Sequence, residues 1–522
     1  MALRSSRRGF IQGSLGAAGA AFAYACSGGG GGPGAVELDH TLVIGSGFGG
    51  CVSALRLAQA GKRVTVIERG RRWPITAAHD TFCSMRHPDG RAAWFSNQTH
   101  VGLHQRIDRY AGIVEKVVGD NIDAIVGAGV GGGSLAYAGM MVRPPQNLFE
   151  AAIPMLDYTE MDTVYYPRAA AQLRIQQVPN EVFDSPNYVA ARVFEDQVTH
   201  AGLTPTRIQS AIDWQLVMAE IRGELTGEAM MGDYIYGLNS GAKGSVDQRY
   251  LADAEATGLV DVRPLHEVLA IGHAPGGTGY RVDVRRIDEM GNTLEMITFH
   301  APSLIVATGA VHTPRLLVTA RETGALPDLP TEIGSSWGNN GQFIRMRADL
   351  TADVGAFQGG PPCVVLHHYD NDVAPVTVEQ ASAAFGYECH CLINPSSSVI
   401  DGTGRMRWDA ATATAKLEWA LENNASAEGA AARTAQILND ANGGTVQNLP
   451  GSTGRHDTFH PLGGCVMGMA TDTYGRVRGH EGLYVIDSSL IPGSTPTANP
   501  AWTIAAIAER AIENVIANDD LG

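Results

Sequence analysis

The chain has 522 residues, of which 44% are hydrophobic and 18% charged, and its formal net charge is −16 at pH 7. This length suggests two domains, and the composition is that of an ordinary folded protein with a sizeable core. The acidic balance excludes nucleic acid as a partner, because no excess of basic residues is available to neutralise a phosphate backbone.

Residues 1–32 resemble an export leader rather than part of a fold. Arg7 and Arg8 precede a weakly apolar, alanine-rich stretch at residues 10–25, which is typical of the twin-arginine (Tat) pathway. At about 16 residues, the stretch is short for a membrane span. A signal-peptidase site of the A-x-A type ends it, and Cys26 follows, ahead of a glycine-rich tether. The pattern predicts export and leaves open whether the protein is secreted, periplasmic or lipid-anchored at Cys26.

The fold is predicted to begin with a strand–helix–strand unit. Two β-branched runs, at residues 40–44 and 63–67, flank a helical stretch at residues 51–61. The turn before the helix contains Gly45, Gly47, Phe48, Gly49 and Gly50. Glycines there let a dinucleotide pyrophosphate approach the backbone at the helix N-terminus. Glu68 has the spacing of the acid that binds the adenosine ribose. An N-terminal site without a second fingerprint downstream favours FAD over NAD.

Hydrophobic periodicity predicts two more elements. Residues 283–287 and 296–300 flank Met290, Gly291 and Asn292, a pattern typical of a β-hairpin. Apolar residues recur at helical spacing over residues 504–515, so we expect the chain to close on an amphipathic helix.

The seven cysteines do not suggest a disulfide framework in a chain of this length. On a strand, Cys389 and Cys391 would share one face, with His390 on the other. Because no second cluster completes a tetrahedral site, we expect no metal.

Three segments farther along carry a family resemblance. A second glycine cluster at residues 127–135 leads into residues 138–140, a Gly-Ala-Val-His-Thr-Pro stretch begins at Gly309, and residues 484–492 are followed by an Asn-Pro pair at 499–500. These segments resemble the glucose–methanol–choline (GMC) oxidoreductases, in which the first of them cradles the isoalloxazine ring.

Within that family, the chain is most similar to the cholesterol oxidases that bind FAD without a covalent bond. Residues 459–466 read Phe-His-Pro-Leu-Gly-Gly-Cys-Val, the form found around their catalytic histidine. The similarity runs from about residue 38 to the C-terminus in the family order.

The resemblance implies an α/β fold of two domains. The first is a discontinuous, Rossmann-type FAD-binding domain, expected at residues 38–80, 240–330 and 476–522, with the flavin-cradling segment 127–140. The second is an α+β substrate-binding domain built on an antiparallel sheet, expected at residues 81–239 and 331–475.

The resemblance also implies non-covalent FAD and a set of cofactor contacts. Besides the glycine turn and Glu68, these are Gly133, Ser134, Tyr137, Ala138, Met140, Val268, Gly309, Asp487 and Ser488.

Three residues match catalytic positions of the family. His460 would orient the substrate hydroxyl and handle its proton. Asn499 would hydrogen-bond the hydroxyl and contact the flavin, at the start of a helix whose dipole favours negative charge on the reduced ring. Glu379 would isomerise the steroid double bond, for which an apolar pocket should raise its pKa.

The resemblance therefore predicts FAD-dependent oxidation of a secondary alcohol, namely a 3β-hydroxysteroid such as cholesterol. The products would be the 3-ketone and, from molecular oxygen, hydrogen peroxide, with isomerisation of the Δ5 bond to Δ4. A sterol-like apolar substrate also implies peripheral contact with the membrane from which it is extracted.

Some residues depart from the family pattern at the flavin edge and in the pocket, namely Tyr137, Ala138, Thr377 and Ala501. They leave open another bulky alcohol as substrate. A GMC-type dehydrogenase that passes electrons to a quinone or cytochrome is the alternative function. A non-catalytic flavoprotein is disfavoured, because His460 and Asn499 are both retained.

Overall fold

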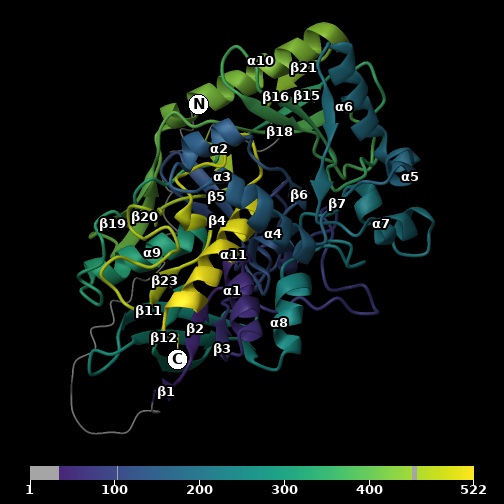
Figure 1. The fold of residues 1–522 in the computed structure, drawn as a ribbon. Coiled ribbons are helices and arrows are strands. Elements are labelled where there is room, and N and C mark those ends of the chain that lie inside the picture. The colour runs from purple at the N-terminus through teal and green to yellow at the C-terminus, as the bar shows by residue number, and fades with distance from the viewer. Residues whose placement is uncertain (1–34, 103, 449–454, 522) are drawn as a thin grey trace, which may run out of the picture.

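The computed structural model describes residues 35–102, 104–448 and 455–521 (Figure 1). The export leader predicted at residues 1–32 lies outside the described residues. Within them, no helix combines the length and the apolar character that crossing a bilayer requires.

The predicted strand–helix–strand unit is confirmed. Strands β2 (Thr41–Ile44) and β3 (Val64–Ile67) are buried and parallel, and helix α1 (Phe48–Gln59) connects them. Glycine is required in the turn, because Gly45 has a φ of +96° and a Cβ there would overlap the carbonyl oxygen of Ala307. A Cβ on Gly49 would likewise overlap the carbonyl oxygen of Ile486, so α1 can lie close to the C-terminal segment.

Five parallel strands form the central sheet, in the order β10-β3-β2-β14-β23. The strands added to β2 and β3 come from distant parts of the chain, namely β10 (Val260–Arg263), β14 (Leu304–Val306) and β23 (Leu483–Val485). Helix α11 (Ala501–Asn518), the predicted terminal helix, packs beside α1 (Figure 1). Arg56 of α1 forms a two-pronged ion pair with the buried Glu509 of α11, with N···O distances of 2.6 Å. The predicted α/β fold of Rossmann type is therefore confirmed.

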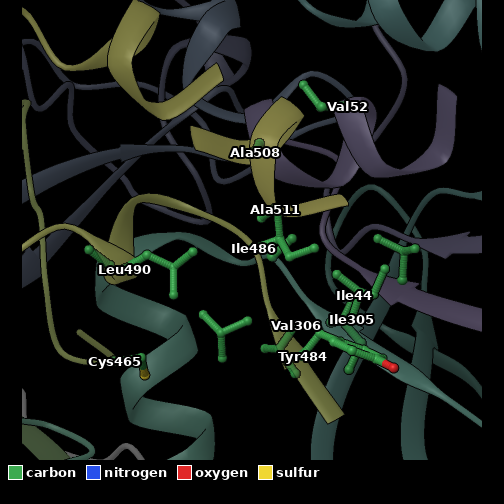
Figure 2. Close-up of a cluster of buried hydrophobic side chains, with 14 of the residues drawn as sticks. Ile44, Val52, Ile305, Val306, Cys465, Tyr484, Ile486, Leu490, Ala508 and Ala511 are labelled. Atoms are coloured by element: carbon green, nitrogen blue, oxygen red, sulfur yellow. The ribbon is translucent and has the colours of Figure 1, made fainter. Parts of the chain in front are cut away.

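The core of this layer joins residues that are far apart in the sequence. Figure 2 shows Ile44 of β2, Val306 of β14 and Val52 of α1 in one cluster with Ala508 and Ala511 of α11. All five side chains are buried. Their burial ties the C-terminal helix to the first strand–helix–strand unit.

The predicted hairpin is also confirmed. Strands β12 (Tyr280–Ile287) and β13 (Thr293–Ala301) pair antiparallel, and β11 (His266–His273) and β1 (Val36–Glu37) complete a four-stranded sheet. Asp288 closes the turn, because its Oδ1 accepts hydrogen bonds from the N–H groups of Met290 and Asn292.

A six-stranded antiparallel sheet forms the second layer, in the order β21-β15-β18-β17-β16-β8. Its strands are β8 (Pro205–Arg207), β15 (Phe343–Ala348), β16 (Val364–His368), β17 (Val376–Glu379), β18 (Leu392–Ser398) and β21 (Thr445–Gln447). Helices α6 (Val189–His200) and α10 (Ala425–Asn442) cover one face of this sheet (Figure 1). Glu379 of β17 lines the cavity described below.

The remaining strands and α-helices complete the fold. The strands are β4 (Val114–Val118), β5 (Ile122–Gly127), β6 (Met140–Met141), β7 (Gln176–Gln177), β9 (Gln209–Ser210), β19 (Arg405–Asp409), β20 (Thr414–Glu418) and β22 (His456–Thr458). The helices are α2 (Gln146–Ala152), α3 (Tyr158–Glu160), α4 (Tyr166–Leu173), α5 (Asn180–Phe183), α7 (Trp214–Ile221), α8 (Ala252–Ala256) and α9 (Gly309–Glu322).

The expectation for the Cys-His-Cys segment was wrong. The segment precedes β18 instead of lying on a strand, and Cys389 and Cys391 form a disulfide bond. His390 has a φ of +46°, which interrupts the alternation of an extended chain. In the described part of the chain, no cluster of three or more His, Cys, Asp or Glu side chains could hold a metal ion.

Candidate active site

A cavity of about 900 Å³ lies between the two layers. It is lined by the glycine turn, Glu68, the segment 127–140, the N-terminal half of α9, and residues around Glu379, His460 and Asn499. This volume lies toward the upper end for ligand pockets and is suited to a large cofactor together with a substrate.

One end of the cavity is built from glycine backbone. Helix α1 begins here with Gly47 as its N-cap, without a side-chain cap and without an acid in its first turn. Gly132 lies over this turn, because a Cβ on Gly132 would meet the Gly47 Cα at 2.7 Å. The free N–H groups of the first helical turn are therefore available to an anionic group in the cavity.

Three glycines leave room for a ligand rather than for protein. A Cβ on Gly47 or Gly133 would meet no protein atom within 4 Å, and on Gly309 its nearest neighbour would be the Ser488 Oγ at 3.9 Å. All three line the cavity, so side chains there would fill it. This cradle fits a dinucleotide that lies against the backbone.

Glu68 stands at the end of β3 with its carboxylate held in place. Its Oε2 accepts hydrogen bonds from the N–H and Oγ of Ser46, at 3.1 and 2.8 Å, and its Oε1 accepts one from the Gly70 N–H at 2.8 Å. Carboxylate oxygens have further lone pairs, so Glu68 could still accept ribose hydroxyls from the cavity.

The second glycine segment lines the cavity at several of the positions that are expected to contact the cofactor. Tyr137 lines the cavity together with Ala138 and Met140, and its hydroxyl donates to the Gly244 carbonyl at 2.9 Å. Its ring also packs edge-on against Phe48, with the ring centroids 5.8 Å apart.

Two residues expected to contact the cofactor do not line the cavity. The buried Ser134 hydroxyl donates to the Gly131 carbonyl at 2.7 Å and accepts from the Val246 N–H at 2.9 Å. Gly50 instead packs against Gly45, where a Cβ would overlap the carbonyl oxygen. Both residues shape the turns that form the cradle.

Val268, Gly309, Asp487 and Ser488 line the cavity as expected. The Asp487 carboxylate accepts from the Gly309 N–H at 2.7 Å, and the Ser488 Oγ accepts from the Ala310 N–H at 2.9 Å. These two side chains therefore cap the N-terminus of α9.

A charged cluster on the cavity wall was missed in the sequence. Glu115 bonds Arg69 at 2.6 Å and His312 at 2.8 Å. Burial opposes ionisation of Glu115, but Arg69 and His312 hold its pKa well below the usual value. Arg315 Nε has no hydrogen-bond partner among the described residues. Helical spacing from Gly309 could have predicted that residues 312 and 315 face the same side.

His460 lines the cavity from a loop that hydrogen bonds hold in place. Its N–H donates to the Thr458 Oγ1 at 2.9 Å, and the preceding N–H, of Phe459, donates to the Gln342 Oε1 at 2.6 Å. Burial lowers the pKa of His460 to about 4, so its ring is neutral at pH 7. A neutral imidazole donates one hydrogen bond and accepts one.

Asn499 and Glu379 meet directly, although they are 120 residues apart. The Asn499 Nδ2 donates to the Glu379 Oε1 at 2.9 Å, while the buried Asn499 Oδ1 has no partner among the described residues. Burial raises the pKa of Glu379 to about 7, although the bond from Asn499 opposes the rise. The wall thus holds a carboxyl group that changes protonation near neutrality and an amide oxygen that lacks a donor.

Comparison with known proteins points to one family. Residues 396–508 match the profile described as GMC oxidoreductase, and residues 43–102 match an NAD(P)-binding Rossmann-like domain. The chain is similar to a cholesterol oxidase of Acinetobacter baumannii, with 25% identity over 92% of this chain and 95% of the relative. These matches support the GMC oxidoreductase family for this chain. FAD is therefore the cofactor of its dinucleotide site.

The chain is also similar to a second curated relative and to two solved structures. A cholesterol oxidase of Mycobacterium tuberculosis (strain CDC 1551 / Oshkosh) is 27% identical over 90% of each chain. Among solved structures, pyridoxine 4-oxidase from Mesorbium loti has a TM-score of 0.65 at 16% identity, over 92% of this chain and 100% of that one. A fungal aryl-alcohol oxidase has a TM-score of 0.62 at 13% identity, over 92% and 99%. The structural neighbours support the fold alone.

Proposed function

We propose that this GMC oxidoreductase oxidises a 3β-hydroxysteroid such as cholesterol to the 3-ketone, reduces oxygen to hydrogen peroxide, and moves the Δ5 double bond to Δ4. The observation that carries the proposal is the buried wall where Glu379 bonds Asn499 and His460 lines the same cavity. The two relatives named cholesterol oxidase support the same substrate class.

Oxidation requires that the substrate hydroxyl be held and that its carbon present the hydrogen to the flavin. The unpartnered Asn499 Oδ1 would accept a hydrogen bond from the hydroxyl, and the neutral ring of His460 would bond the same group. Bound FAD would supply the hydride acceptor and the route by which two electrons reach oxygen. The alcohol loses a hydride and a proton, and oxygen takes up two electrons and two protons.

Isomerisation needs a base that can take a proton from one ring carbon and return it to another. Glu379 suits this task, because a carboxyl group with a pKa of about 7 both accepts and releases a proton near neutral pH. Apolar neighbours such as Ala381 and Ile393 also line the cavity, as a steroid ring system requires.

The test begins with anaerobic flavin bleaching by a Δ5-3β-hydroxysteroid, by simple alcohols and by sugars, followed by admission of oxygen. Bleaching by the steroid, with reoxidation and peroxide on admitting oxygen, is the expected result. Bleaching by simple alcohols while every steroid is ignored would remove the steroid proposal and leave the alcohol oxidoreductase. Reoxidation by a quinone or cytochrome but not by oxygen would favour the dehydrogenase.

The product separates isomerisation from oxidation. Wild-type enzyme should form the conjugated 4-en-3-one, which absorbs in the ultraviolet, and Glu379→Gln should accumulate the unconjugated 5-en-3-one. A wild-type enzyme that releases only the 5-en-3-one would exclude Glu379 as an isomerase base.

We also propose that the protein works outside the cytoplasm, after export by the predicted leader. The Cys389–Cys391 disulfide supports this location, because such bonds persist in oxidising compartments. Contact with a membrane is supported by Phe385 and Tyr387, which stack at 5.7 Å. Phe385 lines the cavity, and the Tyr387 side chain is 62% exposed. Tyr387→Ser should weaken binding to sterol-containing vesicles, and unchanged binding would exclude this contact.

A further inference from the structure

Asn340 is a buried residue to which no sequence motif pointed. It is fully buried beside His460, in a turn where its φ is +66°, a conformation that asparagine tolerates better than most residues. Its Nδ2 lies 3.5 Å from the His460 Nδ1 and donates to the Ala498 carbonyl at 2.8 Å. The turn therefore brings a side-chain amide against one edge of the candidate catalytic imidazole.

The amide of Asn340 can adopt only one orientation here. Its Oδ1 accepts from the N–H and Oγ1 of Thr495, at 2.7 and 3.1 Å, and lies 3.4 Å from the Ser494 Oγ. A backbone N–H can only donate and the Ala498 carbonyl can only accept, so exchanging the amide oxygen and nitrogen would break both bonds. The group that faces His460 Nδ1 is therefore the NH2.

This orientation decides which ring nitrogen of the neutral His460 carries the proton. A proton on His460 Nδ1 would point at the NH2 of Asn340, leaving two donors opposed in a buried site. A lone pair on Nδ1 can accept the second N–H of the amide instead. The ring proton then belongs on Nε2, which bonds none of the described residues on a ring that lines the cavity.

We propose that Asn340 is a positioning residue that keeps the proton of neutral His460 on Nε2, so that the ring donates a hydrogen bond into the cavity. This inference rests on the proposed alcohol oxidation for its purpose. His460 would donate to the substrate oxygen while the hydroxyl donates to the Asn499 Oδ1. The ring is then a donor to the hydroxyl rather than the first acceptor of its proton.

The tautomer can be measured without any substrate. Holoenzyme labelled with ¹⁵N in its histidine rings gives separate nitrogen resonances for protonated and unprotonated positions, and the set lost in His460→Gln belongs to His460. We expect an unprotonated Nδ1 and a protonated Nε2 at neutral pH. A protonated Nδ1 in the wild-type enzyme overturns the proposal, whatever alcohol the enzyme oxidises.

Asn340→Asp provides the reciprocal test, because a carboxylate of the same shape would accept a proton from Nδ1. We expect the ring proton to move to Nδ1 and flavin reduction to slow by about 10²–10³, the loss expected when one hydrogen-bond donor to the reacting oxygen is removed. Asn339→Asp is the matched control, since Asn339 is equally buried but bonds Gly341 and Gln342 within the turn. The control should keep the wild-type tautomer. A wild-type tautomer in Asn340→Asp would refute the proposed role, and the wild-type spectrum decides if this variant does not fold.

Discussion

Glu379 should destabilise the folded protein above neutral pH, and replacing it with glutamine should remove that cost. The side chain is 5% exposed, and burial raises its pKa from 4.5 to about 7. The difference corresponds to about 3 kcal/mol. Glutamine keeps an oxygen that can accept the Asn499 Nδ2 without carrying a charge.

The sign of the effect follows from which state holds the proton. Below about pH 4.5 the carboxyl group is protonated in both the folded and unfolded chain, so Glu379 costs nothing there. Between pH 4.5 and 7 the unfolded chain releases the proton while the folded protein keeps it, and stability falls as pH rises. Above about pH 7 the full cost is present. Glu379→Gln should therefore stabilise the protein at pH 8 and have little effect at pH 5.

The magnitude can be measured as a shift in melting temperature. A chain of this size has an unfolding entropy of roughly 1 kcal/mol per degree, so about 3 kcal/mol corresponds to about 3 °C. Melting of the holoenzyme would be followed by flavin fluorescence at one fixed scan rate, at pH 5 and pH 8. Glu422→Gln, at an exposed glutamate, controls for the change in charge. An equal gain at both pH values, or a loss at pH 8, would refute the assigned cost of burial.

Three further predictions concern the cofactor, the chemistry and the location. The purified protein should be yellow and should release intact FAD on denaturation, whereas flavin that stays with the precipitated chain would exclude non-covalent binding. His460→Ala and Asn499→Leu should each slow flavin reduction by about 10²–10³ while FAD remains bound, and near wild-type reduction by the true substrate would remove both residues from the mechanism. Replacing Arg7 and Arg8 with lysine should leave the protein in the cytoplasm, and unimpaired export would exclude the twin-arginine pathway.

Local patterns in the sequence were sufficient for the first strand–helix–strand unit, the hairpin and the terminal helix. The strand–helix–strand unit, the turn at Gly45 and the position of Glu68 follow from hydrophobic periodicity and from the conformations that only glycine adopts freely. The hairpin and α11 were predicted for the same reason. Each of these features depends on residues that are close together in the chain.

The family resemblance predicted residues of the site that hydrophobic periodicity could not predict. It brought Glu379, Asn499 and His460 to one site, and all three line the cavity. It could not show that Asn499 bonds Glu379, because that contact joins residues 120 positions apart. The raised pKa of Glu379 follows from the same burial, which no local pattern measures.

Only the tertiary structure decided the remaining features. Strand alternation misplaced Cys389 and Cys391, because the positive φ of His390 folds the chain back and brings the two sulfur atoms together. Asn340 lies in an Asn-Asn-Gly stretch that reads as an ordinary turn, and its effect on His460 exists only because Thr495 and Ala498 hold its amide. The sequence by itself determined which local conformations were allowed and, through the resemblance, the class of chemistry. The tertiary structure decided which polar groups face one another, because hydrogen-bond partners and burial are set by segments that meet only in the folded chain.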